Sequence, residues 1–289
     1  MLLCGLHIIH NYSTRFGEDP RLLSTGYLVA TVLALSMDLR FSGGALHTLT
    51  WRLVGLCILY AAASGLIYIF LLLDSNQIHP TDAVLAEAIA PFVAGVLVAF
   101  ASRKKQSARK VDMYGVACVF AAFGLLLWQV GLRHSSSGDE SNIYNIAVLA
   151  VLYAISQALY RPIALVGRPY AVAAMTAAFA GTLTFSVSLW RGTGIAIGHE
   201  LRIYGILLGF AIAASQTTML VGFNRCGVVT AYIVLASVVP MAYLADFLRT
   251  GNWTLSASSL ALAYFAVIAV RVVREARLQT GKDHPLLSG

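Results

Sequence analysis

The second half of this chain repeats its first half, with corresponding residues about 150 positions apart. Prolines, glycines and threonines recur at equivalent places in apolar segments of the same length and character. The matched pairs are Pro20 with Pro169, Gly55 with Gly205, Thr81 with Thr230, and Pro91 with Pro240. The pattern predicts a duplicated chain whose repeats are residues 1–137 and 138–289, an arrangement typical of membrane transporters.

The composition predicts that the chain lies in a lipid bilayer. Hydrophobic residues make up 58% of it and charged residues only 11%, so a soluble globule would lack the polar groups to cover its surface. The spans must be helices, because backbone N–H and C=O groups find no partner in lipid. Ten apolar runs are candidates: Leu2–Phe16, Leu22–Met37, Leu53–Leu73, Thr81–Ala101, Met113–Leu132, Ile143–Tyr160, Tyr170–Trp190, Ile203–Gly222, Gly227–Leu248 and Leu255–Val273.

Five spans in each repeat fix the relative orientation of the two halves. The second repeat must start on the opposite side of the membrane from the first, so the halves are inverted. With both termini cytoplasmic, fourteen of the twenty basic residues fall inside, as the positive-inside rule requires. The net charge of +7 then reflects topology, and we expect no nucleic-acid partner. The predicted fold class is all-α integral membrane, with ten transmembrane helices as two inverted five-helix repeats.

The first run is shorter at its start than its counterpart in the second repeat, which begins near Ile143. Either the first helix is short, or the chain begins downstream of its natural start.

Motifs of soluble enzymes are missing from the sequence. It has no Gly-rich phosphate loop after a strand, no Gly-x-Ser-x-Gly elbow and no His-Glu-x-x-His pair. Its four cysteines lie at no metal-ligand spacing. We therefore expect no enzymatic activity, no cofactor and no metal site. Polar residues at membrane depth are the candidates for function, because a polar group that is costly to bury in lipid must face a cavity or a partner.

Glu87 is the sharpest of these candidates. It lies well inside an apolar run, one helical turn before Pro91, whose missing N–H loosens the backbone. One interpretation is a carboxylate that pairs with a cationic group of a substrate or carries a coupling proton. The other is a glutamate near the outer mouth that stays hydrated or bonds a neighbour. Pro91 and Pro240 are the predicted hinges.

Other polar residues recur at helical spacing in the first and sixth runs, and the eighth run contains four consecutive polar residues. They are typical either of a cavity lining or of polar contacts between helices. In the eighth run not all of residues 215–218 can face one side, and we choose Ser215 and Thr218. The full set of additional candidates is His7, His10, Asn11, Ser64, Tyr153, Ser156, Gln157, Tyr160, Ser215 and Thr218. The small residues from Gly205 to Gly209 instead indicate close helix packing.

Three segments resemble the drug/metabolite transporter superfamily, EamA type. The two proline-containing segments are AIAPFVAGVLV at 88–98 and SVVPMAYLADFL at 237–248, and they look like the fourth helix of each repeat. The Gly-rich segment is GVACVFAAFG at 115–124 and looks like the fifth helix. The resemblance implies ten helices in two inverted repeats, with a central cavity lined by the first, third, fourth, sixth, eighth and ninth helices.

The expected function is transport of a small polar metabolite, amino-acid-like or amine-bearing, by alternating access of the two repeats. Export is the expected direction, and proton coupling is left open. The expected location is the cytoplasmic (inner) membrane, with both termini cytoplasmic, as a monomer or homodimer whose partners are a small-molecule substrate and the lipid bilayer. The alternative is an integral-membrane transferase or a lipid-linked-sugar flippase.

Overall fold

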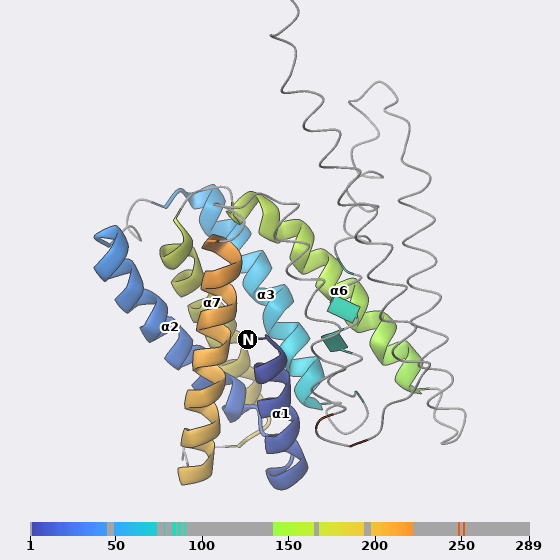
Figure 1. Cartoon of the computed structure of the whole chain (residues 1–289). Helices are drawn as coiled ribbons and strands as arrows, with labels where there is room; N and C mark the ends of the chain where they lie inside the picture. Colours follow the sequence, from blue (N-terminus) through green and yellow to red (C-terminus); the bar gives the residue numbers. More distant parts are fainter. Residues whose placement is uncertain are drawn as a thin grey trace, which may run out of the picture.

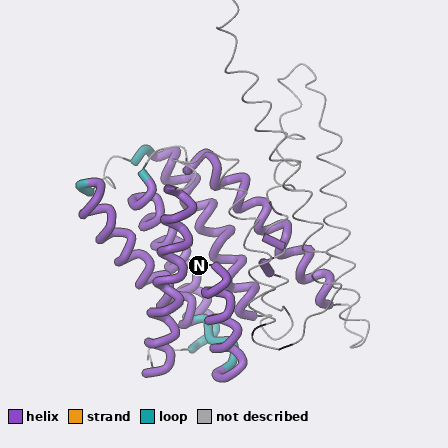
Figure 2. Tube along the Cα trace, viewed as in Figure 1, coloured by secondary structure: helices purple, strands orange, loops and turns teal. Residues whose placement is uncertain are grey.

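The computed structural model describes residues 2–44, 49–73, 78, 83–84, 86–87, 90, 141–164, 168–193, 198–221, 248 and 251. All regular secondary structure in this part of the chain is helical (Figure 2). The helices are α1 (Leu2–Phe16), α2 (Arg21–Ser42), α3 (Trp51–Leu73), α6 (Ser141–Ala164), α7 (Pro169–Trp190) and the helix His199–Val221.

Five helices are long and apolar enough to cross a membrane: α2, α3, α6, α7 and His199–Val221. Helix α1, with 15 residues, is shorter than the roughly 20 residues that a span needs. All six helices coincide with runs predicted from the sequence, which confirms an all-helical fold with candidate membrane spans. The runs Met113–Leu132, Gly227–Leu248 and Leu255–Val273, and most of Thr81–Ala101, lie outside the described residues.

Helices α2 and α7 have matching lengths and matching boundary residues. Each contains 22 residues; Pro20 immediately precedes α2, and Pro169 is the first residue of α7. Proline suits a helix start, because its missing N–H would be unpaired there in any case. Gly43 and Gly192 follow the two helices with φ angles of 65° and 67°, a left-handed conformation that glycine adopts without steric cost. Helices α2 and α7 therefore share their length and the residue types at both ends.

The helices pack in a bundle in which α3 lies between α6 and α7, while α2 packs along α7 (Figure 1). Helix α1 contacts His199–Val221, drawn in orange, through an edge-to-face pair of Tyr12 and Tyr204 whose ring centres are 5.5 Å apart. The first three helices thus interleave with the later three and do not form a separate unit.

Glycines permit a close crossing of α2 and the helix His199–Val221. A Cβ atom at Gly205 would lie 2.6 Å from Thr25 Cγ2, and one at Gly209 would lie 2.5 Å from Val29 Cβ. From the other side, a Cβ at Gly26 would lie 3.0 Å from Leu208 Cγ. The predicted packing role of Gly205 and Gly209 is confirmed.

Large apolar side chains cover the outside of the bundle. They include Leu28, Val32, Leu59, Leu66, Ile206, Leu207 and Phe210. Trp51 at the start of α3 and Trp190 at the end of α7 are 89% and 86% exposed. Tryptophan is enriched at both membrane–water interfaces, so these two residues are suited to the ends of the apolar zone.

Candidate functional site

Glu87 is buried inside the bundle, with 5% of its surface exposed. The described residues around it, Ala83, Val84, Ala86 and Ala90, are helical and completely or almost completely buried. The side chains of Tyr60, Tyr68 and Tyr153 are close enough to the Glu87 carboxylate to interact with it electrostatically. These tyrosines come from α3 and α6, beside which the short helical pieces around Glu87 are drawn (Figure 1).

Helix α6 contributes one polar stripe in an otherwise apolar helix. Tyr153, Ser156, Gln157 and Tyr160 recur at spacings of three and four residues, and all four are buried. Helix α6 packs against α3, where Tyr60 meets this stripe. The hydroxyl of Ser156 lies beside that of Tyr60. The rings of Tyr60 and Tyr160 lie with their centres 5.2 Å apart.

Two further contacts extend this group to the helix His199–Val221 and to α2. Tyr160 Oη donates a hydrogen bond to the backbone oxygen of Gln216 at 3.4 Å. Tyr27 of α2 stacks edge to face with Tyr68 at 5.9 Å between ring centres, and the hydroxyl of Ser64 lies beside that of Tyr27. We call the whole set the Glu87 cluster. Its members are Tyr27, Tyr60, Ser64, Tyr68, Glu87, Tyr153, Ser156, Gln157, Tyr160 and Gln216.

Gln157 and Gln216 of the Glu87 cluster each have a side-chain oxygen that accepts no hydrogen bond from the described residues. The Oε1 atoms of Gln157 and Gln216 are buried and have no hydrogen-bond partner among the residues that the structure describes, as is also true of Tyr27 Oη. The two residues are 7% and 8% exposed. An unpaired polar atom in a dry interior costs free energy. Such a site is therefore suited to a ligand that supplies the missing hydrogen bonds.

The structure brings together six of the predicted site residues in this cluster: Ser64, Glu87, Tyr153, Ser156, Gln157 and Tyr160. His7 and His10 of α1 are half-buried, and Asn11 is exposed. The predicted hinges Pro91 and Pro240 lie outside the described residues.

Of the four polar residues 215–218 in the helix His199–Val221, the structure buries a different pair from the Ser215 and Thr218 selected from the sequence. Gln216 and Thr217 are buried, Ser215 is half-buried and Thr218 is exposed. Thr217 Oγ1 donates to the backbone oxygen of Ala213 at 2.7 Å, so its hydroxyl is satisfied within its own helix. Gln216 is therefore the member of the quartet that joins the Glu87 cluster.

Sequence reasoning passed over the tyrosines of α3. A signal for them was present, because Tyr60, Ser64 and Tyr68 are spaced four residues apart and share one helix face. It also passed over Asp38, which lies one turn before the end of α2 and is 2% exposed. Asp38 Oδ1 is buried and has no hydrogen-bond partner in the described part of the chain. The predicted apolar run ended at Met37, whereas the helix continues to Ser42, and that extension places Asp38 inside it.

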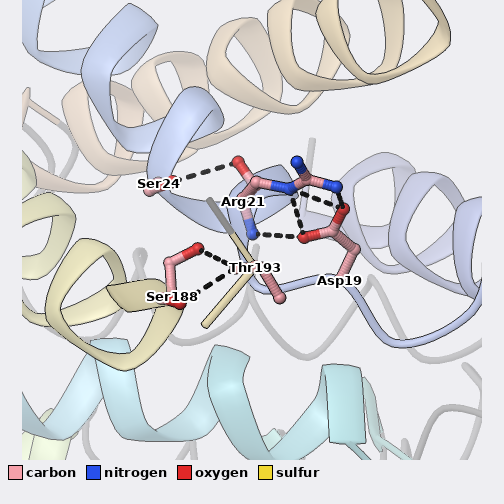
Figure 3. Close-up of polar contacts among 5 residues, drawn as sticks. All are labelled: Asp19, Arg21, Ser24, Ser188 and Thr193. Carbon is pink, nitrogen blue, oxygen red and sulfur yellow. Dashed lines mark hydrogen bonds and ion pairs between the residues drawn. The ribbon is translucent and has the colours of Figure 1, made fainter. Parts of the chain in front are cut away.

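A separate polar group at the start of α2 has a structural role. Asp19 accepts hydrogen bonds from the backbone and the guanidinium of Arg21, the shortest being 2.7 Å from Nη2 to Oδ2 (Figure 3). A carboxylate at a helix N-terminus also interacts favourably with the helix dipole. At the end of α7, Thr193 Oγ1 lies 3.0 Å from Ser188 Oγ and donates to the Ser188 backbone oxygen at 2.9 Å (Figure 3). Both groups therefore stabilise helix ends.

Metal ligation finds no support in the described part of the chain, where no three His, Cys, Asp or Glu side chains lie together. The Glu87 cluster offers one carboxylate, several hydroxyls and two amides. This chemistry binds polar or cationic organic groups better than it binds a metal ion.

Comparison with known proteins yields a shared fold and no family. No family model matches the chain, and no curated protein does. Three chains of solved structures match. One of them, described as "Crystal structure of protein", has a TM-score of 0.64 and 16% sequence identity, and the match covers 96% of this chain and 95% of that one. At this identity the similarity concerns the fold alone.

Proposed function

We propose that this chain is a membrane transporter that exports a small polar metabolite, amino-acid-like or amine-bearing, through alternating access of two inverted repeats. The observation that carries the proposal is the Glu87 cluster. It places a buried carboxylate and unpaired amide oxygens deep among apolar helices, where ionisable groups commonly mark substrate and ion pathways. Its helices come from both halves of the chain, as a site between two moving repeats requires.

Reciprocal packing supports the inverted repeats. In the proposed duplication α1 corresponds to α6, α2 to α7, and α3 to the helix His199–Val221. Helix α3 packs on α6 and α7, and the helix His199–Val221 packs on their counterparts α1 and α2. Helices α2 and α7, which are each other's counterparts, pack together. A two-fold axis in the membrane plane would generate this set of contacts, and it would bring Pro91 and Pro240 to equivalent bends.

The resemblance to the drug/metabolite transporter superfamily, EamA type, agrees with this proposal. The proposed location is the cytoplasmic membrane with both termini inside, because that orientation places all four lysines, Lys104, Lys105, Lys110 and Lys282, on the cytoplasmic side.

Cysteine labelling tests the topology. A cysteine at Ser136, in the polar link between the halves, should react with a membrane-impermeant maleimide in intact cells, and one at Ser107 only after permeabilisation. Cys4, Cys57, Cys118 and Cys226 are replaced by alanine in both variants, so that any label reports the new cysteine. Labelling of both positions from the same side would contradict the inverted repeats.

A ligand screen followed by flux measurement tests transport itself. The purified protein is heated with a metabolite library rich in amines and amino acids, because a ligand that binds the folded state raises its apparent stability. A hit should then cross the membrane of proteoliposomes containing the protein and not of empty liposomes. Stabilisation without flux for every hit would contradict transport and favour a membrane transferase or a receptor.

A further inference from the structure

We infer that the Glu87 cluster selects a small organic cation that carries N–H donors and no carboxylate, such as a primary amine or a guanidine. The inference rests on the proposed function, because it takes the Glu87 cluster to be the substrate site. It goes further by excluding amino-acid zwitterions and quaternary ammonium ions.

The first argument is the charge of the buried groups. Among the described residues, the buried charged side chains are Asp38 and Glu87, and both are acidic. A zwitterion needs a buried donor or cation for its carboxylate, since an unpaired carboxylate in a low-dielectric site is strongly disfavoured. The described side chains of the Glu87 cluster include no arginine, lysine or histidine. Tyr27 Oη is a hydroxyl without a hydrogen-bond partner among the described residues, but one neutral donor does not offset the cost of burying a carboxylate.

The second argument is the balance of donors and acceptors. Several hydroxyl donors already bind acceptors in the protein: Tyr160 Oη donates to the Gln216 backbone, and Ser64 Oγ donates to the Ala61 backbone at 3.4 Å. The unused atoms include two amide oxygens, Gln157 Oε1 and Gln216 Oε1, which can only accept. A ligand that pairs with either oxygen must donate, and a primary ammonium or a guanidinium has at least three N–H groups while a quaternary ammonium has none.

The third argument is the aromatic lining. Tyr60 and Tyr160 lie with their rings 5.2 Å apart, and Tyr68 and Tyr153 lie close to Glu87. Tyrosine faces attract cations through the ring quadrupole. Carboxylate, amide oxygens and ring faces thus all favour positive charge on the ligand.

Matched compounds test the inference on the purified full-length protein. Calorimetric titration compares isobutylamine with valine, phenethylamine with phenylalanine, and agmatine with arginine, so that each pair differs by one carboxylate. The N-trimethyl derivative of phenethylamine tests the need for N–H donors. At least one amine or guanidine should bind tenfold or more tightly, as an order of magnitude, than its amino acid, and phenethylamine should exceed its trimethyl derivative similarly.

Two variants locate the binding at the cluster. Gln157→Leu and Gln216→Leu remove the acceptors at nearly constant volume, and each should weaken binding of the preferred amine roughly tenfold. The melting temperature should stay near that of the parent, since each variant removes a buried amide oxygen that has no hydrogen-bond partner among the described residues. Thr182→Val, at an exposed hydroxyl of α7, is the matched control and should bind as the parent does.

Several results would overturn the inference: tighter binding of the amino acids, equal binding of the trimethyl compound, no binding of any amine, or unaltered binding in both glutamine variants. Flux measurements in proteoliposomes distinguish failure of the proposed selectivity from failure of the proposed transport function. Transport of an amino acid or an anion would refute the selectivity and leave transport standing. An amine that binds at the cluster and never crosses the membrane would support the selectivity and refute transport.

Discussion

Replacing Gly209 with alanine should destabilise the protein by about 1–3 kcal/mol, the usual cost of forcing an extra methyl group into a packed interior. The added Cβ would lie 2.5 Å from Val29 Cβ and 2.8 Å from the backbone oxygen of Gly26. Real carbon atoms do not approach so closely, so α2 and the helix His199–Val221 would have to move apart. The Gly26 oxygen belongs to the backbone of α2, so it cannot move aside as the end of a flexible side chain can.

The measurement is the melting temperature of the detergent-solubilised protein, together with the fraction that elutes as a single species. Gly55→Ala is the matched control, because Gly55 also lies in a candidate membrane-spanning helix but a Cβ there meets nothing within 4 Å. That variant should melt at or above the parent temperature, since alanine favours helix over glycine. Equal melting temperatures of Gly209→Ala and Gly55→Ala would show that α2 and the helix His199–Val221 are not tightly packed where they cross.

Local signals predicted the described helices well. Prolines mark the starts of α2 and α7, and Gly43 and Gly192 follow their ends. Long apolar runs give their lengths, because a helix in lipid must satisfy its own backbone over the full thickness. Where polar residues extended a helix beyond its apolar run, as at Asp38, hydropathy alone placed the end too early.

Which side of each helix faces the interior was harder to predict. In the helix His199–Val221 residues 215–218 are all polar, so neither hydropathy nor periodicity distinguishes the buried members. The close approach to α2 at Gly205 and Gly209 sets the rotation of this helix, and the resulting rotation buries Gln216 while exposing Thr218. Such contacts join residues about 180 positions apart, and no local pattern contains them. The polar stripe on α6 was predictable because its residues recur at spacings of three and four in an otherwise apolar helix.

The substitution Glu87→Gln should abolish pH-dependent transport, or binding, of a cationic substrate while the protein remains folded and inserted. Glutamine keeps the shape and the hydrogen bonding of glutamate but carries no charge and cannot exchange a proton. Loss of a charge-assisted hydrogen bond in a buried site weakens binding by roughly one to two orders of magnitude. The neutral amide that replaces the carboxylate attracts a cation far less.

Flux in proteoliposomes, measured over a range of pH, checks this expectation, with elution profile and melting temperature as controls for folding. Asp38→Asn is the matched control, because Asp38 is also a buried carboxylate but lies near the end of α2. It should retain the pH profile of the parent if the effect belongs to the Glu87 cluster and not to any buried acid. Unchanged flux and an unchanged pH profile in Glu87→Gln would reduce Glu87 to a packing residue. Tyr153, Gln157 and Gln216 would then remain as candidates for the site.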